Sequence, residues 1–577
     1  MTFSYKTNDS AKVTLTERSY TEGVTLVDVD VIFDEPTVPQ MLTVMWNVDC
    51  VDMYSVWGPF PGFERVLGPS WSKKVTSSRL ASGAPLHALI SYGGQNRMTV
   101  ALSDAATPTA IATGVREENA HVNCEVRFFT MPINSITEYH ATIYIDRRDV
   151  AYHKALAAAE KYWVDECGYP EAYTPDAARR PMYSCWYSFH QEIDIPAILE
   201  QCRLAKAMGM DSVIVDDGWQ TDNNSRGYAY CGDWEPVASK VPDMKVFVDQ
   251  VHEIGMKFIL WYSVPFVGRF SKAYERFADM LLGSTMSNKN WASLDPRFPE
   301  VREYLIDIYR RAAIEWGLDG VKLDFIDSFR LLPETPAFDE RWDTRSLEEG
   351  VDRLLAGITE ALKAVNPDIL IEFRQSYYGP NIRKYGNMIR VRDCPNDSLM
   401  NHVYGTDLRL ALGKTPIHSD MLMWHNDDLV ESAAHQVICT LFCVPQISVH
   451  LDKIPEAHKK MLAFWLAYWN RNRDVLLDGE FSAENPESLY SLVRAEKDGH
   501  IIAVAHAKPI VTVKEFCKLD FVNASSETSL VVRTGHCGVR TYTVVDCMGN
   551  VVEQGSCELS AGLHEFNVPH CGMLQIQ

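Results

Sequence analysis

The stretch GVKLDFIDSF, residues 320–329, decides the fold of the central part of this chain. Its apolar residues form a strand-like run, yet Lys322 and Asp324 alternate with Val321 and Leu323. Because successive side chains of a strand point to opposite faces, both charges lie on one side. A buried strand accepts two charges on one face only where that face meets a pocket or compensating partners.

The segments around this stretch share one pattern. LAKAMGMDSVIVDD, VHEIGMKFILWYS and AIEWGLDGVKLDF each run from an amphipathic helix through a glycine, namely Gly209, Gly255 or Gly317, into an apolar strand. A glycine at a helix C-terminus supplies a left-handed cap, after which the chain can turn back at once. Three such units predict parallel strands joined by helices.

The series continues with DILIEFRQS, NMIRVRD, TPIHSDMLMWH and VPQISVHL, and PMYSCWYSF supplies a first strand. Eight strands of this kind predict a central (β/α)8 TIM barrel over residues 179–474. Short β-branched and aromatic runs predict an N-terminal β-sandwich over residues 1–150, followed by a helical linker over 151–178. Alternating strands with glycine-rich turns predict a small C-terminal antiparallel β domain over 475–577.

Composition narrows the classes of partner. A chain of 577 residues is too long for one core, and its net charge of -22 disfavours nucleic acid and anionic membranes, which attract Lys and Arg. Neutral ligands remain open. We find neither a signal-peptide pattern nor an apolar run of membrane-spanning length, and the 14 cysteines form no CxxC pair. Cys439 and Cys443 are expected to be buried thiols, and reduced cysteines fit a cytoplasmic protein.

The predicted C-terminal strand ends carry most of the chemistry. They hold Asp216, Asp217, Trp219, Trp261, Lys322, Asp324, Glu372, Arg374, Arg392, Asp393, His418 and Asp420. Carboxylates around one barrel mouth suit glycoside hydrolysis, in which one acid acts at the anomeric carbon and another protonates the leaving oxygen. Lys322 would keep Asp324 ionised. Flat aromatic faces suit sugar rings, and the candidates are Trp186, Trp219, Trp234, Trp261 and Trp424.

The motifs VIVDDGWQ, GDWEPVASKVPDMKVFVDQVHEIGMKFILWYSVPF, GVKLDFID and RVRDCPND resemble glycoside hydrolase family 36, the α-galactosidase and raffinose-synthase group, in order and spacing. The resemblance covers about residues 180 to 450. It implies that Asp324 is the nucleophile and Asp393 the general acid/base. It also implies that Asp216 and Asp217 hold the 4- and 6-hydroxyls of the sugar, with Lys322 assisting.

Two departures from the family pattern concern substrate contacts. Members of the family place a Cys and a glycine-rich turn after the fifth strand, near carbon 2 of the sugar, whereas this chain has EFRQSYYGPN with Arg374 and Tyr377. The family's binding arginine stands four residues before the acid/base, whereas Arg390 and Arg392 stand three residues and one residue before Asp393.

Several alternatives stay open from the sequence. Asp324 could form only a salt bridge with Lys322, and Asp397 could take the protonating role. Asp216 and Asp217 could merely cap a turn. Arg374 could either neutralise Glu372 or contact the sugar. His418, Asp420 and His425 invite a metal interpretation, but no further ligand at regular spacing accompanies them, so we expect no metal.

The sequence thus predicts a retaining exo-α-glycosidase of α-galactosidase type that needs no cofactor. The expected substrate is a small oligosaccharide or glycoside ending in α-galactose or a 2-modified galactose-like sugar. The substrate-binding candidates are Asp216, Asp217, Trp219, Trp261, Lys322, Glu372, Arg374, Arg390, Arg392 and Trp186. Alternatives are a transglycosylase of the raffinose-synthase type and a non-catalytic carbohydrate-binding protein. In a homo-oligomer, the sandwich could reach over a neighbour's barrel mouth.

Overall fold

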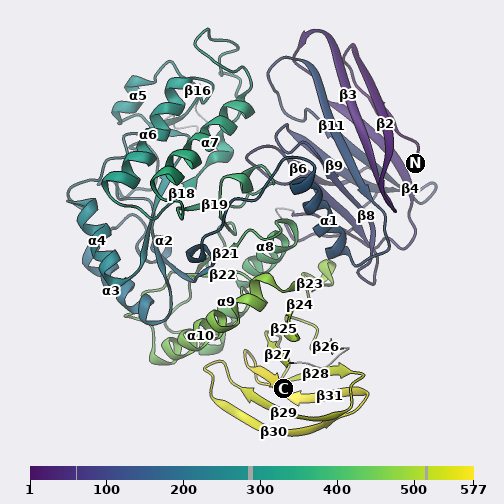
Figure 1. Ribbon diagram of the computed structural model, residues 1–577, viewed down its shortest axis with the longest axis vertical. Helices are drawn as coiled ribbons and strands as arrows, with labels where there is room; N and C mark the ends of the chain where they lie inside the picture. The colour runs from purple at the N-terminus through teal and green to yellow at the C-terminus, as the bar shows by residue number, and fades with distance from the viewer. Residues whose placement is uncertain (60–61, 284–289, 514–517) are drawn as a thin grey trace.

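The chain forms a central barrel with a separate β part on either side of it in sequence. The computed structural model describes residues 1–59, 62–283, 290–513 and 518–577. Figure 1 shows the N-terminal β part in purple and blue beside the barrel, and the C-terminal β part in yellow below it. The predicted fold class is therefore confirmed.

Eight strands close the barrel in the order of the sequence. They are β12 (Met182–Ser184), β13 (Ser212–Val215), β14 (Lys257–Ser263), β18 (Gly320–Asp324), β19 (Leu370–Arg374), β20 (Met388–Arg390), β21 (Ile417–Leu422) and β22 (Val444–Ile447). Every neighbouring pair is parallel, including the closing pair β12 and β22. The strands' C-terminal ends therefore meet at one mouth.

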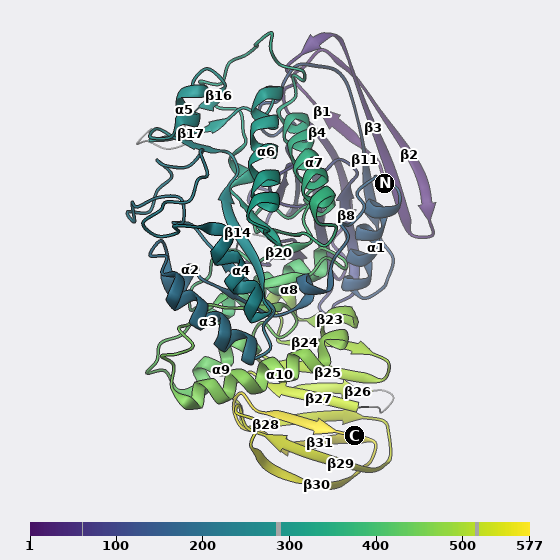
Figure 2. The same ribbon diagram turned by 60° about the vertical axis from the view of Figure 1, so that its left-hand side comes forward.

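Helices connect these strands on the outside of the barrel, as Figure 2 shows for α3, α4, α6 and α7. The helices between barrel strands are α2 (Trp186–Phe189), α3 (Ile195–Ala207), α4 (Met244–Ile254), α6 (Pro299–Glu315), α7 (Leu347–Val365), α8 (Ser398–Ala411) and α9 (Val430–Ile438), and α10 (Glu456–Asp478) follows the last barrel strand. The glycines predicted to turn the chain all have left-handed backbone, with φ of +89° at Gly209, +85° at Gly255 and +75° at Gly317. The helix-to-strand turns form where the sequence places them.

Apolar side chains close the barrel at the end opposite the mouth. A separate buried cluster there contains Ala178, Met182, Ile214, Ile259, Leu370 and Met388. His418 is bound to this closed end, because its Nε2 lies 2.9 Å from the Ala178 carbonyl oxygen. The expectation that His418 lies at the mouth was therefore wrong, since it stands near the beginning of β21 and not at its end.

An additional small sheet interrupts the connection between β14 and α6, and the sequence analysis did not predict it. Its strands are β15 (Phe266–Gly268), β16 (Leu281–Gly283) and β17 (Trp291–Leu294), and the short helix α5 (Lys272–Arg276) lies between the first two. The insertion begins beside the mouth, because Val264 N donates to the Asp324 carbonyl oxygen over 3.0 Å. At Gly268, in β15, an added Cβ would lie 2.2 Å from the backbone of Ala229. Only glycine therefore allows β15 to pack this closely against the segment that contains Ala229.

The N-terminal part is a sandwich of two sheets. One sheet has the order β1 (Ser4–Lys6), β4 (Leu42–Asp49), β10 (His121–Phe128), β9 (Thr109–Arg116) and β6 (Lys74–Ser78). The other has the order β2 (Ala11–Thr21), β3 (Val24–Thr37), β11 (Ile136–Asp146), β8 (Asn96–Leu102), β7 (Leu86–Ile90) and β5 (Ser55–Trp57). Alternate residues of β10 are buried, as expected for a strand with one face on a core. Helix α1 (Tyr152–Asp165) follows.

The C-terminal part also has two sheets. The larger contains β23 (Glu480–Glu484), β24 (Leu492–Lys497), β25 (His500–Ala505), β27 (Lys518–Asn523), β32 (Met573–Ile576), β29 (Gly538–Val545) and β30 (Val551–Leu559); the smaller contains β26 (Ile510–Val513), β28 (Ser529–Thr534) and β31 (Gly562–Asn567). The expected antiparallel pairing holds for most neighbouring strands, but β25 with β27 and β26 with β28 are parallel. From β25 to β28 the chain alternates between the two sheets, so the two strands of each of these pairs run the same way.

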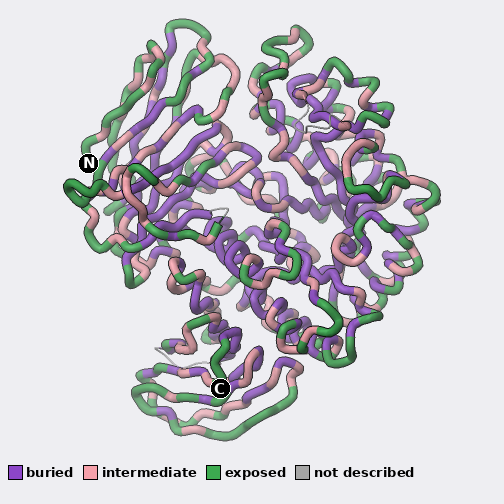
Figure 3. The backbone as a smooth tube through the Cα atoms, turned by 180° about the vertical axis from the view of Figure 1, so that it is seen from behind, coloured by how far each residue is buried: buried purple, intermediate pink, exposed green. Residues whose placement is uncertain are grey.

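The three parts meet in a buried polar junction. Arg65 of the N-terminal part pairs with Asp407 of α8 over 2.6 Å, and neither side chain is exposed. Tyr490, which precedes β24, donates to Asp407, and Trp57 Nε1 donates to the Tyr490 hydroxyl over 2.8 Å. Figure 3 shows buried backbone running through the centre of the molecule. Among the described residues, no helix has the length and apolar character needed to cross a bilayer.

Candidate active site

Asp324 ends β18 and accepts hydrogen bonds from three side chains. Trp261 Nε1 donates to Oδ2 over 3.0 Å, Arg374 Nε donates to Oδ1 over 2.8 Å, and Tyr377 OH donates to the same Oδ1. Burial alone would raise the pKa of Asp324, but the charges of Arg374 and Lys322 and the hydrogen bonds outweigh it and hold the pKa well below its ordinary range. The carboxyl group is therefore ionised at neutral pH, as an attacking group must be.

The backbone turns sharply directly after Asp324. Phe325 has φ of +63°, a left-handed conformation that is uncommon for an aromatic residue. This conformation lets the Phe325 N–H donate to Asp324 Oδ1 over 2.8 Å. Such a conformation costs about 1–3 kcal/mol, which the surrounding packing must offset. The backbone strain therefore stands beside a carboxylate that receives several donors, the setting in which functional sites store strain.

Lys322 pairs with an acid on another strand. Its Nζ donates to Asp216 Oδ2 over 2.6 Å, and the two side chains are only 4% and 5% exposed. The alternative in which Lys322 forms its salt bridge with Asp324 was therefore wrong. Lys322 acts on Asp324 through its charge, while its hydrogen bond goes to the end of β13.

Asp217 is bound by two amide side chains. Gln191 Nε2 donates to Oδ2 and Gln220 Nε2 donates to Oδ1, both over 2.7 Å. Burial raises the pKa of Asp217 to about 6, against the lowering effect of the Gln220 bond and with a further increase from the charge of Asp216. Asp216 Oδ1 does accept the N–H of Asp217 over 2.9 Å, a local turn contact. Because Gln191 lies beyond α2, the pair does more than cap that turn.

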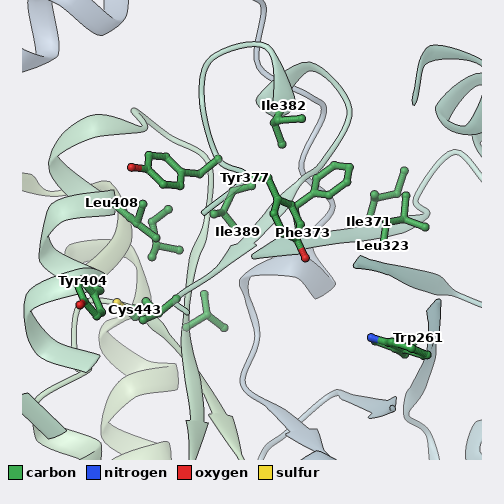
Figure 4. Packing of buried hydrophobic residues seen from close by; sticks show 14 of the residues in the cluster. Trp261, Leu323, Ile371, Phe373, Tyr377, Ile382, Ile389, Tyr404, Leu408 and Cys443 are labelled. Carbon is green, nitrogen blue, oxygen red and sulfur yellow. The ribbon is translucent and has the colours of Figure 1, made fainter. Parts of the chain in front are cut away.

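Arg374 faces Asp324 and not Glu372. Its Nε donates to Asp324 Oδ1 over 2.8 Å, and its side chain is 18% exposed. Tyr377 lies in the loop after β19 and is fully buried; Figure 4 shows it beside Phe373, with ring centroids 6.2 Å apart. The pairing of Arg374 with Glu372, one of the two expectations, was wrong.

Asp393 lies in the loop after β20 and is more open than Asp324. Its side chain is 55% exposed, against 9% for Asp324. Arg390 Nη2 donates to Asp393 Oδ1 over 2.9 Å. Burial raises the pKa of Asp393, but the charges of Arg390 and Arg374 outweigh burial and give a net lowering. Arg374 therefore acts electrostatically on both candidate catalytic carboxyls, which places Asp324 and Asp393 at one mouth.

The neighbours of Asp393 bear on two alternatives that the sequence leaves open. Asp397 caps α8 by accepting the Met400 N–H over 2.9 Å, so its carboxylate already has a structural role. Arg392 lies over the ring of Tyr404 on α8, 5.5 Å from the ring centroid. Of the two candidate arginines, Arg390 is therefore the one in contact with Asp393.

Glu372 lies two residues before the end of β19 and is completely buried. Gln446 Nε2 donates to its Oε2 over 2.5 Å, and its Oε1 lies 3.9 Å from Arg390 Nε. Burial raises the pKa of Glu372, and the charges of Lys322 and Arg390 oppose this. Glu372 thus belongs to a polar layer inside the barrel, beneath the mouth.

The five tryptophans take different positions. Trp186 is partly exposed, with the guanidinium of Arg226 5.4 Å from its ring centroid. Trp219 is fully buried, and its Nε1 donates to the Trp261 carbonyl oxygen over 3.0 Å. The expectation that Trp219 offers a surface to sugar was therefore wrong in this structure. Trp219 instead packs in the core and holds the backbone of Trp261.

Two other tryptophans are also internal. Trp234 is 3% exposed and Trp424 is 5% exposed, and Trp424 Nε1 donates to His458 of α10 over 3.2 Å. These rings fill the space around the mouth and are not open platforms, because a tryptophan at a strand end can equally well point into the core. Trp261 is just as buried, at 2% exposed, and adjoins the candidate site only through its hydrogen bond to Asp324. Of the five, Trp186 is the one that is partly exposed.

Candidate metal ligands do not gather in the residues that the structure describes. No group of three or more His, Cys, Asp or Glu there is placed to hold an ion. His418 lies at the closed end of the barrel, Asp420 is bound to Arg390, and His425 is 74% exposed beyond β21.

Sequence reasoning missed two residues after the first barrel strand. Tyr187 donates to Asp420 over 2.9 Å, and Gln191 binds Asp217. The usable signal was their position, because polar residues just after a barrel strand lie at the mouth whatever their type. Nothing in their own sequence context marks them.

Comparison with known proteins agrees with this geometry. The sequence profile of the melibiase family matches residues 175–479, slightly more than half of the chain. An α-galactosidase of Lactobacillus acidophilus is 29% identical over 348 residues, which cover 55% of this chain and 45% of that enzyme. The A type blood α-D-galactosamine galactosaminidase of Flavonifractor plautii is 26% identical over 216 residues, covering 34% of this chain and 19% of that protein. The chain spans under half the length of these relatives.

Solved structures extend the likeness to the whole fold. The family 36 α-galactosidase AgaA of Geobacillus stearothermophilus superimposes with a TM-score of 0.65 at 15% identity, covering 98% of this chain and 81% of that one. Variants of that enzyme have been solved with stachyose and with raffinose. At this identity the superposition carries the fold alone.

Proposed function

Because this chain belongs to the melibiase family, that is, to glycoside hydrolase family 36, we propose that it is a retaining exo-α-galactosidase. It removes a terminal α-linked galactose, or a galactose-like sugar modified at carbon 2, from a small oligosaccharide or glycoside. The observation that carries the proposal is the difference between two carboxyls at one mouth. Asp324 is buried and held ionised by several donors, whereas Asp393 is open and bound by one arginine.

In the proposed first step, Asp324 attacks the anomeric carbon while the bond to the leaving oxygen breaks and Asp393 gives that oxygen its proton. Sugar binding covers Asp393 and so raises its pKa, which favours the protonated form that this step needs. In the second step, Asp393 takes a proton from water as the water attacks the anomeric carbon and the ester bond to Asp324 breaks, which returns Asp324 to its ionised form. Esterified Asp324 no longer carries a charge, so the pKa of Asp393 falls again and suits the base. Two inversions give net retention.

The remaining site residues would hold the sugar. Asp216 and Asp217 are proposed to bind its 4- and 6-hydroxyls, with Lys322 fixing Asp216. Trp186 would offer an apolar face to the ring, and Trp261 would line the site beside it while its indole N–H holds Asp324. Three other candidates act close to the two carboxyls: Arg374 on Asp324, Arg390 on Asp393, and Glu372 beside Arg390. Arg392, which lies over Tyr404, is left as a candidate for contact with the substrate.

A 2-modified sugar is the second candidate substrate. Arg374 and Tyr377 occupy the segment where the family resemblance expects smaller residues near carbon 2, and one relative is named for its action on galactosamine. The guanidinium of Arg374 favours a substituent that accepts hydrogen bonds, such as a hydroxyl or an acetamide, and repels a protonated amine.

A panel of substrates tests both the proposed α-galactosidase activity and the proposed preference at carbon 2. We expect turnover of 4-nitrophenyl α-galactoside or its 2-acetamido analogue, with retained configuration in the first-formed sugar, and much weaker turnover of the 2-amino analogue. Absence of turnover on any aryl α-glycoside would leave the non-catalytic carbohydrate-binding alternative. A sugar product transferred to an added acceptor in preference to water would establish the transglycosylase alternative.

The described cysteines bear on the cellular compartment. All of them are free thiols in the structure, which suits a reducing environment. We therefore also propose a cytoplasmic location, which fractionation of the source cells tests directly.

A further inference from the structure

Asp420 is a fully buried acid on β21 that the proposed reaction does not use directly. Its Oδ1 accepts from Arg390 Nη1, and its Oδ2 accepts from the Cys394 N–H over 2.6 Å and from Tyr187 OH over 2.9 Å. All three contacts are donors. A protonated carboxyl group would need an acceptor for its own proton, so this arrangement fits an ionised carboxylate.

These contacts hold the chain on both sides of Asp393. Arg390 precedes Asp393 by three residues and Cys394 follows it directly. Building on the proposed function, we propose that Asp420 is a positioning residue that fixes the location of Asp393 and controls how readily Asp393 holds its proton. It does so without touching the sugar, through the guanidinium of Arg390 and the backbone of Cys394.

Arg390 is shared by three carboxyl groups. Its guanidinium lies 2.9 Å from Asp393, in direct contact with Asp420, and 3.9 Å from Glu372. An arginine that faced Asp393 alone would stabilise the ionised form strongly and make it a poor proton donor. Because Asp420 neutralises the same guanidinium, Asp393 feels a weaker positive field.

Charged and titratable groups from several elements surround this pair. They include Lys322 on β18, Arg374 on β19, Arg390 on β20, Tyr187 on α2 and the thiol of Cys394 beside Asp393. Lys322 and Arg374 both add positive charge near Asp393. Removing the negative charge of Asp420 therefore leaves Asp393 facing three cations.

The test is Asp420→Asn, which keeps the shape and removes the charge. We expect the basic limb of the kcat/KM profile against pH to move down by about one unit, because Asp393 then loses its proton more readily. Substrates with poor leaving groups should lose about 10- to 100-fold in kcat/KM, and those with good leaving groups less than about threefold, because only the former need the proton. An unmoved basic limb with equal losses on both substrate types overturns the proposal.

Two matched variants separate this role from mere stability. Asp407→Asn removes another buried, arginine-paired acid outside the site, and its basic limb should stay where the wild type has it. Tyr187→Phe removes one neutral donor to Asp420 and should move the limb far less than Asp420→Asn does. If Asp420→Asn does not fold, Asp420→Glu serves instead, because it keeps the charge and displaces it. We expect kcat on substrates with poor leaving groups to fall while the basic limb of the pH profile stays at its wild-type position. Full activity of Asp420→Glu overturns the proposal.

A crystal structure of Asp420→Asn separates this inference from the proposed function. If the wild type turns over no α-galactoside, the proposed function fails, yet displaced Asp393 and Cys394 in the variant still establish that Asp420 positions them. If wild type is active and the variant superimposes on it with an unchanged pH profile, the proposed function stands and the positioning role is overturned.

Discussion

Two buried carboxylates in this protein share one arrangement of partners and differ in their acidity. At the mouth, Asp324 accepts from Arg374 and from Tyr377. At the junction of the three parts, Asp407 likewise accepts from an arginine and a tyrosine, Arg65 and Tyr490. Burial raises the pKa of Asp407 despite these partners, whereas the pKa of Asp324 is lowered.

The two pKa values shift in opposite directions because Asp324 has additional donors and an additional positive charge near it at the barrel mouth. Asp324 also receives the Trp261 indole N–H, the Phe325 backbone N–H and the charge of Lys322. The described surroundings of Asp407 hold one cation, so burial prevails there. A buried Arg–Asp pair is therefore no sign of function by itself. The second cation and the additional donors mark the reactive carboxylate.

The largest effect should follow from Asp324→Ala. We expect turnover of an aryl α-galactoside to fall by about 10³-fold or more, because the attacking group is gone, while the circular dichroism spectrum stays that of the wild type. With Asp324→Gly, added azide should enter from the opposite face and give the β-glycosyl azide. Activity within tenfold of wild type would show that the mouth carboxylate is as structural as Asp407.

Asp393→Ala should have the next largest effect. We expect a loss of about 10²- to 10⁴-fold on substrates whose leaving group needs a proton, and a much smaller loss on activated aryl substrates. Azide should restore turnover and give the α-glycosyl azide, which chromatography against synthetic standards identifies. A β-azide, or equal losses on all substrates, contradicts the acid/base assignment.

At the junction the same kind of change should act on stability. Asp407→Asn leaves Arg65 buried without its counter-charge, so we expect the free energy of unfolding to fall by about 3–5 kcal/mol. Denaturant titration followed by tryptophan fluorescence measures this. The folded fraction should keep the kcat of wild type, and a specific loss of kcat would remove the distinction between the two sites.

Arg374→Gln should have the smallest effect of these four changes. Since Arg374 holds the pKa of Asp324 below its ordinary value, its removal raises that pKa, and the acidic limb of kcat/KM should move to higher pH by about one unit. The matched variant Arg65→Gln should leave the limb in place. A limb that stays fixed in Arg374→Gln means that Lys322 and the hydrogen bonds suffice to keep Asp324 ionised.

The sequence predicted the barrel because each of its units carries local signals. Gly209, Gly255 and Gly317 adopt the left-handed backbone that their position after a helix requires. The sheet inserted at β15, β16 and β17 escaped prediction, because its three- and four-residue strands are too short to show a period. The parallel pairs of the C-terminal part escaped for another reason, since strand order depends on contacts distant in sequence.

Within the candidate site, residue type was easier to predict than partner. Strand alternation correctly placed Lys322 and Asp324 on one face, but it could not say that Lys322 reaches across to Asp216. It also could not separate Trp219, which is buried, from Trp186, which is partly exposed, because aromatic residues suit both the core and a sugar. Such choices depend on the packing of neighbouring strands, which one sequence does not display.

The left-handed backbone at Phe325 also limits what can replace it. In a library with this codon randomised and selected for growth on an α-galactoside, glycine and asparagine should persist, because both adopt positive φ at low cost. Valine, isoleucine and proline should vanish, although valine and isoleucine are as apolar as the original ring. The position would look intolerant of hydrophobic residues while carrying one, a substitution pattern that only the backbone explains.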